Sequence, residues 1–174
     1  NGKTKLTINK HDFYALVLPP VYVISRPAFQ KIVDFAKKGG TVILLGDLPK
    51  GSSEYGMNDE MIIAQSNALK RMSNVIDLAT QRDKQKELVV ALNNNVKPQM
   101  KFENAGRLYT AHRTIGNTHL YWLSNNTDTI RNFTAWLRDG EGAAEIWNCE
   151  TGQMQLIPFD KEKGYNKVVL TLNP

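Results

Sequence analysis

Two patterns of apolar and polar positions divide this chain. Up to about residue 92, short continuous apolar runs at 15–18 and 41–45 alternate with stretches in which apolar residues recur every three or four positions. Continuous runs of this length are typical of strands buried on both faces, and the longer period is typical of helices. Beyond residue 98 the apolar positions come in short stretches with turn residues between them, which predicts antiparallel strands.

A helix is predicted between the two apolar runs. Ser25 is a good N-cap, Pro27 is tolerated in the first turn, and Gly39 can adopt the left-handed conformation that ends a helix. One apolar face is formed by Phe29, Ile32, Val33 and Ala36. Two buried strands joined by a helix predict a right-handed βαβ unit on a parallel sheet. Further elements are predicted at 60–72 and 84–92 (helices) and at 74–78 (a short strand).

A polar loop follows the second predicted strand, at the edge where open α/β sheets bind ligands. It carries Asp47, Ser53, Glu54 and Asp59, with Glu60 directly after it. Hydrolysis of a glycosidic bond needs two carboxyl groups roughly 5 to 10 Å apart, which a loop of this kind can supply. The alternative is structural: Asp47 helps a turn, Asn58 or Asp59 caps the next helix, and Glu54 is solvated.

The second half predicts a β-sandwich beyond a polar linker, NNNVKP, at 93–98. We therefore expect domains at 1–97 and 98–174. The pair Gly116-Asn117 predicts a type II′ hairpin that places Ile115 opposite Thr118 and Ala111 opposite Trp122. Other strands are predicted at 130–138, 144–147, 154–157 and 167–172.

Histidines and tryptophans of this half are the remaining candidates for chemistry. His112 and His119 fall on one face of the hairpin, but no third metal ligand is nearby, so an ordinary cross-strand pair of His112 with Tyr121 is expected. Exposed tryptophans can stack on sugar rings, which makes Trp122 a candidate substrate contact. We expect at least two of Trp122, Trp136 and Trp147 to pack in the core of the sandwich.

Composition narrows the function classes further. The 174 residues carry a net charge of +5, but the basic residues are scattered among acidic ones, so no nucleic-acid interface is predicted. No apolar run is long enough to span a membrane. The single Cys149 supplies neither a disulfide nor a zinc site, and the phosphate-binding and nucleophile motifs GxGxxG, Walker A and GxSxG are absent. No cofactor and no metal is expected.

The polar opening NGKTKLTINK contains no signal peptide, and we expect a piece of a longer polypeptide.

Several motifs together resemble one family. They are the strand–helix–Gly-Gly–strand unit, the loop LPKGSSEYGMND, the strand HRTIG leading to YWLSN, and the segment EIWNCETG. In this order they are similar to the C-terminal region of bacterial glycoside hydrolases of the α-L-rhamnosidase group, glycoside hydrolase family 106.

The resemblance implies an α/β domain of the flavodoxin-like, class I glutamine-amidotransferase-like type, followed by a β-sandwich. It also implies that the catalytic carboxylates lie in an N-terminal barrel domain of the same polypeptide, which would be secreted or periplasmic. The chain is then a non-catalytic accessory fragment that buttresses the barrel and lines the substrate cleft with its polar loop. The candidate substrate-binding residues are Asp47, Ser53, Glu54, Asp59 and Trp122. An independent carbohydrate-binding or oligomerisation module, and a small self-contained hydrolase, are the alternatives.

Overall fold

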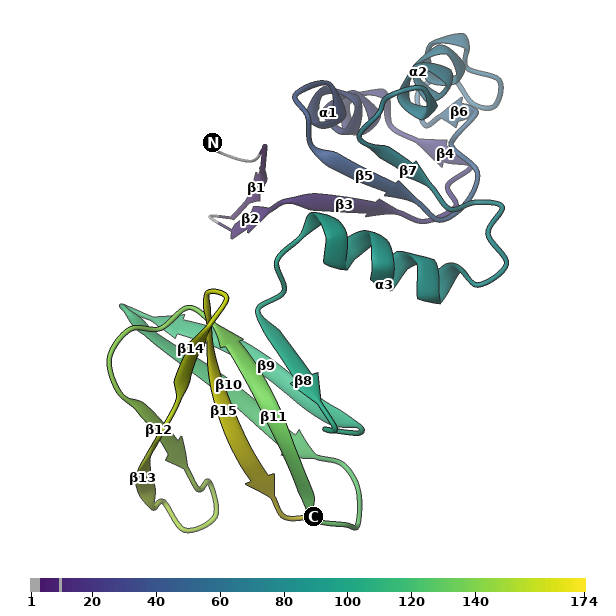
Figure 1. Ribbon diagram of the computed structural model, residues 1–174. Coiled ribbons are helices and arrows are strands. Elements are labelled where there is room, and N and C mark those ends of the chain that lie inside the picture. The colour runs from purple at the N-terminus through teal and green to yellow at the C-terminus, as the bar shows by residue number, and fades with distance from the viewer. Residues whose placement is uncertain (1–3, 10) are drawn as a thin grey trace. The chain divides into compact units, whose positions relative to one another are not determined.

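The computed structural model describes residues 4–9 and 11–174 and separates into two compact units, one ending at Lys97 and the other beginning at Pro98 (Figure 1). Residues 1–3 and 10, part of the polar opening segment, lie outside the described residues. The first unit contains β1 (Leu6–Ile8), β2 (His11–Phe13), β3 (Ala15–Leu18), β4 (Val23–Ile24), α1 (Arg26–Lys37), β5 (Thr41–Leu44), β6 (Gly51–Ser52), α2 (Glu60–Lys70), β7 (Val75–Asp77) and α3 (Lys84–Asn95). The second unit contains β8 (Met100–Glu103), β9 (Leu108–Ile115), β10 (Thr118–Asn125), β11 (Arg131–Arg138), β12 (Ala144–Trp147), β13 (Met154–Ile157), β14 (Asp160–Glu162) and β15 (Tyr165–Leu172).

A three-stranded parallel sheet in the order β3-β5-β7 is the centre of the first unit. The central strand β5 is buried on both faces, with Val42, Ile43 and Leu44 all fully inaccessible to solvent. Val42 and Leu44 belong to the core shared with α1 and α2, and Ile43 belongs to a separate core with Ala91 of α3. The predicted parallel βαβ unit is confirmed. Within the described residues the strand order follows the chain order without a reversal.

Helix boundaries follow the predicted capping residues. The Ser25 hydroxyl accepts a hydrogen bond from the backbone N–H of Ala28, and Gly39 after α1 has a φ of +89°. At α2 the structure decides between the two predicted caps: Asp59 accepts from the N–H groups of Met61 and Ile62. The helices begin where sequence predicts, while α2 ends slightly earlier and α3 slightly later than expected.

Beyond the ends of β3 and β5 the chain continues side by side in a second, shorter parallel pair, β4 with β6. Backbone bonds from Lys50 and Gly51 to the carbonyl of Tyr22 lead into this pair. It places the polar loop directly beside the first turn of α1. Strands of two residues have no readable period, and sequence did not predict them.

The second unit is antiparallel throughout. A four-stranded sheet in the order β14-β15-β11-β8 buries Phe133, Ala135 and Val168, and the hairpins β9–β10 and β12–β13 cover this face. Leu123 and Ile146 are among the hairpin residues that pack against this core. The hairpin β9–β10 has the predicted register, with Ala111 opposite Trp122, and Gly116 has a φ of +58°.

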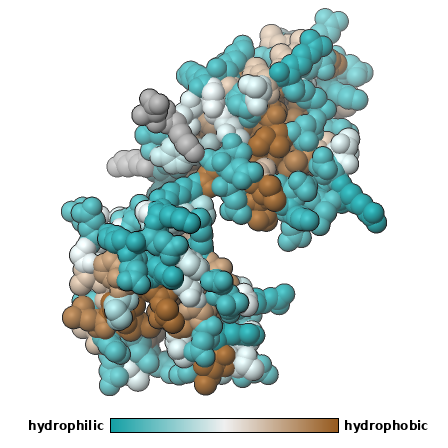
Figure 2. Space-filling model, viewed as in Figure 1, coloured by the Kyte–Doolittle hydropathy of each residue, from teal (hydrophilic) through white to brown (hydrophobic). Residues whose placement is uncertain are grey.

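The expectation for the tryptophans is wrong. Trp122 and Trp147 are 48% and 59% exposed, and Trp136 is half-buried. The reason is that neighbouring residues of the same strands, Leu123 and Ile146, face the core, so the tryptophans point to the other side of each hairpin. Hydrophobic side chains accordingly remain at the surface of each unit (Figure 2).

Candidate functional site

The loop between β5 and α2 forms a closed turn at its tip. The backbone N–H and C=O of Ser52 are both bonded to Gly56, at 2.8 Å in each direction. Gly51 has no room for a side chain, because a Cβ there would meet the carbonyl oxygen of Gly56 at 2.6 Å, and Gly56 itself has a φ of +77°. These contacts fix the position of residues 53–55 on the outside of the loop.

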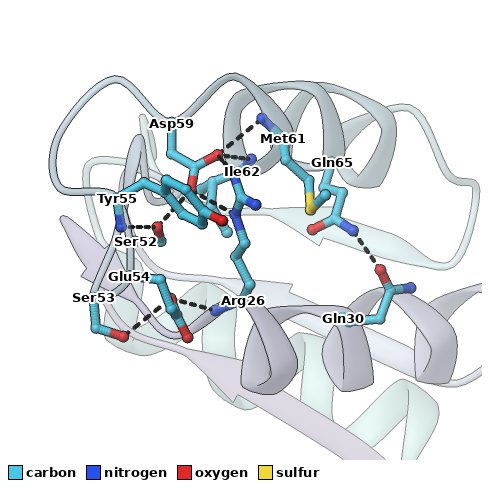
Figure 3. Close-up of polar contacts among 10 residues, drawn as sticks. All are labelled: Arg26, Gln30, Ser52, Ser53, Glu54, Tyr55, Asp59, Met61, Ile62 and Gln65. Carbon is cyan, nitrogen blue, oxygen red and sulfur yellow. Dashed lines mark hydrogen bonds and ion pairs between the residues drawn. The ribbon is translucent and has the colours of Figure 1, made fainter.

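An ion pair between Arg26 and Asp59 joins this loop to α1 (Figure 3). Arg26 donates from Nε to Oδ2 and from Nη2 to Oδ1 of Asp59, both at 2.8 Å. The Asp59 side chain is fully buried and also accepts from the Ser52 hydroxyl and from the N–H groups at the start of α2. The paired guanidinium, followed by the Ser52 hydroxyl and the Ile62 N–H, holds the pKa of Asp59 well below its ordinary value.

Glu54 lies at the N-terminus of α1. Its Oε2 accepts from the backbone N–H of Arg26 at 3.1 Å and from the Ser53 hydroxyl at 3.2 Å. The Arg26 N–H is the main reason that the pKa of Glu54 is lowered. The backbone N–H of Glu54 itself also contributes to lowering this pKa. This carboxylate is therefore ionised at neutral pH, and the exposed Glu54 side chain is accessible to a ligand.

Tyr55 extends from the closed turn with 69% of its surface exposed. The guanidinium carbon of Arg26 lies 3.8 Å from the centre of the Tyr55 ring, and the Tyr55 N–H donates to the Ser52 hydroxyl at 3.0 Å. Because Arg26 is itself locked by Asp59, the ring rests on a fixed cation that covers one face. An aromatic side chain in this position offers its other face to a ligand or a partner.

The structure brings three of the five predicted residues, Ser53, Glu54 and Asp59, around Arg26. Asp47 is exposed, and only its backbone carbonyl, which accepts from the Val21 N–H at 3.3 Å, has a contact given by the structure. Trp122 belongs to the second unit. The predicted helix-capping role of Asp59 is confirmed, whereas Glu54 binds a backbone N–H rather than water alone.

Sequence reasoning missed Arg26 and Tyr55. Arg26 is 33 positions from its partner Asp59, and only the fold makes them neighbours. The sequence held one local signal. Tyr55 is an aromatic residue inside a polar turn of Ser, Glu and Gly, and an aromatic side chain in such a turn indicates a contact with another group.

In the second unit, His112 Nε2 and His119 Nδ1 are hydrogen-bonded at 3.1 Å, and the Tyr121 ring stacks on His112 at 4.6 Å. The predicted pairing of His112 with Tyr121 is confirmed. Burial lowers the pKa of His112 and raises that of Tyr121 to about 12. Over residues 4–9 and 11–174, no group of three or more His, Cys, Asp or Glu side chains is arranged to hold a metal ion.

A comparison of the sequence with protein families gives a match over residues 1–161 to glycoside hydrolase family 106, described as alpha-L-rhamnosidase. The chain belongs to this family. The resemblance stated from its motifs is confirmed. No curated protein matches this member of family 106.

Among solved structures, the rhamnosidase from Novosphingobium sp. PP1Y is similar to this family 106 chain, with a TM-score of 0.70 and 20% sequence identity. The match covers 99% of this chain and 17% of that one. This likeness shows a shared fold, and the chain spans about a sixth of the length of that relative.

None of the helices in the described part of the chain is long and apolar enough to cross a membrane.

Proposed function

We propose that this chain is a non-catalytic accessory part of a larger glycoside hydrolase, in which the loop from Asp47 to Asp59 lines one wall of the substrate cleft. The main support is the rigidity of the loop. Its buried groups hydrogen-bond to one another, and the resulting fixed turn presents Ser53, Glu54 and Tyr55 to solvent. Preorganised polar groups beside an aromatic ring are what a sugar-binding surface requires.

The protonation states of the loop carboxylates argue against hydrolysis by this loop. Glycosidases need a general acid, and that carboxyl group must have a raised pKa to hold a proton at neutral pH. The pKa values of Asp59 and Glu54 are both lowered, and Asp59 is sealed beneath Arg26. Two carboxylates that stay ionised at neutral pH suit binding and positioning, not proton donation.

Each residue then has a distinct role. Glu54 Oε1 and the Ser53 hydroxyl would bond to sugar hydroxyl groups, and the open face of Tyr55 would stack on the apolar face of a sugar ring. Asp59 is a positioning residue, because it acts only through Arg26 and the start of α2. Asp47 is a peripheral contact at the exposed beginning of the loop.

The proposal extends to the surrounding polypeptide. The catalytic carboxylates would lie in an N-terminal barrel domain of the same chain, exported to the periplasm or the exterior of a bacterium. The division at 97/98 would be a domain boundary. A flavodoxin-like origin of the first unit is supported by helices on both faces of its parallel sheet, and a β-sandwich assignment of the second by two hairpins packed over one sheet.

Hydrolysis of an aryl α-L-rhamnoside by the isolated 174-residue chain and by the complete polypeptide tests this division of labour. We expect turnover only by the complete polypeptide. Turnover by the isolated chain that disappears in Glu54→Gln would overturn the accessory role.

The alternative of an independent carbohydrate-binding module is favoured by a different observation, the exposed aromatic face of the second unit.

A further inference from the structure

The outer face of the hairpin β9–β10 is a second candidate surface. Alternate residues of the two strands point away from the core: Tyr109, Ala111, Arg113 and Ile115 on β9, and Thr118, Leu120, Trp122 and Ser124 on β10. Four of these are large and exposed, from 43% for Leu120 to 69% for Ile115. The other side of the same hairpin packs on the core through Leu108 and Leu123, so the outer face is the more exposed of the two.

The two aromatic residues on this face stand opposite short side chains. Trp122 is paired with Ala111, and Tyr109 is paired with Ser124. No long side chain of the partner strand therefore stands directly opposite either ring. Trp122 and Tyr109 are diagonal neighbours, a relation that places Cα atoms roughly 7–8 Å apart and within reach of one planar ligand.

The polar tips of the two aromatic residues on this face form no hydrogen bond within the described part of the chain. Trp136 and Trp147 donate their indole N–H to Glu162 and Glu145, but the indole N–H of Trp122 has no partner among the described residues. The Tyr109 hydroxyl likewise lacks one there, in contrast to those of Tyr121 and Tyr165. Tyrosine and tryptophan on protein surfaces usually combine an apolar body with such a polar tip.

Arg113 gives the outer face of β9–β10 a positive charge. The Arg113 side chain makes only a 3.4 Å contact to the neighbouring His112 carbonyl and forms no ion pair within the described part of the chain. None of the eight outward residues is acidic. A ligand for this face must therefore present flat apolar surface, many oxygen acceptors and negative charge. A protein partner would need a separate acceptor placed against each of these donors. An acidic sugar carries oxygen acceptors around every ring.

We propose that the outer face of β9–β10 binds an acidic oligosaccharide, with sugar rings on Trp122 and Tyr109 and a uronate carboxylate on Arg113. This inference deepens the proposed carbohydrate role and rests on it, but it concerns a surface separate from the Asp47–Asp59 loop. The hairpin β12–β13 offers a contrast. Its exposed face combines Trp147, Met154 and Leu156 with Glu145, and so carries an acceptor where β9–β10 carries donors.

Calorimetric titration of the 174-residue chain with oligogalacturonate tests the proposal, with the methyl-esterified oligomer as the neutral control. We expect binding that weakens with salt and is about ten-fold or more weaker in Trp122→Ala and for the esterified oligomer. Arg113→Gln should remove the preference for the acidic form, and Trp147→Ala should bind as the unaltered chain does.

Three results would overturn the proposal: no binding at millimolar oligomer, equal binding of both oligomers, or equal losses in the Trp122 and Trp147 variants. Should Trp122→Ala unfold, the double variant Trp136→Phe, Trp147→Phe leaves Trp122 as the sole indole. Its emission must then change on binding, and an unchanged spectrum with heat released would contradict the site. Rhamnoside hydrolysis by the complete polypeptide is measured separately, so failure here leaves the loop proposal intact.

Discussion

The loop of the first unit and the hairpin face of the second unit treat their polar groups in opposite ways. At the loop, Asp59 accepts hydrogen bonds from both Arg26 of α1 and Ser52, and this buried network holds the exposed residues of the loop in place. On the hairpin, Arg113 and the polar tips of Trp122 and Tyr109 are left to solvent. A saturated buried network stabilises one conformation, whereas donors exposed to solvent are available to a ligand. Substitutions in the buried network beneath the loop should therefore change stability first, whereas substitutions of exposed side chains, in the loop or on the hairpin, should change mainly binding.

Removal of the Asp59 carboxylate should have the largest effect. Asp59→Ala leaves the Arg26 guanidinium and the Ser52 hydroxyl without their partner and removes the cap of α2, all at a buried position. We expect a strong loss of stability in urea unfolding, confined to the first unit. Asp47→Ala, in the exposed part of the same loop, is the matched control and should leave the midpoint unchanged.

Closure of the loop can be broken at Gly51. A methyl group there would approach the Gly56 carbonyl to 2.6 Å, so Gly51→Ala must open the turn at a cost of about 1–3 kcal/mol. Equilibrium unfolding gives the stability, and the loss should be larger than for Gly116→Ala, where no atom lies within 4 Å of the added Cβ. A smaller loss at Gly51 than at Gly116 would contradict this order and show that the positive φ of Gly116 costs more than the contact at Gly51.

Acid should weaken the first unit through protonation of Asp59. The pKa of Asp59 is lower in the folded state than in the unfolded chain, so its contribution is complete above the unfolded value of about 3.9 and is lost as pH falls below it. Urea midpoints at pH 7 and pH 3 should differ for the unaltered chain. In Asp59→Asn the difference should shrink, and a persistent full difference would assign the acid sensitivity to other groups.

Truncation of the exposed rings should affect stability least. Tyr55→Ala and Trp122→Ala remove mostly solvated surface, and we expect each to change the free energy of unfolding by about 0.5 kcal/mol or less. Phe29→Ala, in the solvent-inaccessible core of the first unit, should by contrast cost about 3–5 kcal/mol. A large loss of unfolding free energy in Tyr55→Ala would mean that the ring helps to hold the Arg26 guanidinium in place.

The parts of the fold that sequence predicted are those governed by local periodicity. The parallel pair of β3 and β5, the Ser25 and Asp59 caps, and the register of the hairpin around Gly116 all follow from residues close together in the chain. The contact of Arg26 with Asp59 depends on the two-residue pair β4–β6, which has no readable pattern. The side that Trp122 takes could not be read either, because both faces of its strand mix apolar and polar residues.

Whether the loop lines the substrate cleft is tested by the kinetics of rhamnoside hydrolysis. The complete polypeptide that carries this chain is compared with its Tyr55→Ala variant. If the fixed edge of the loop lines the substrate cleft, Tyr55→Ala should raise KM or lower kcat/KM for an oligosaccharide substrate while the thermal midpoint stays unchanged. Identical kinetic constants for the two proteins would contradict the cleft role and leave the loop as a structural closure only.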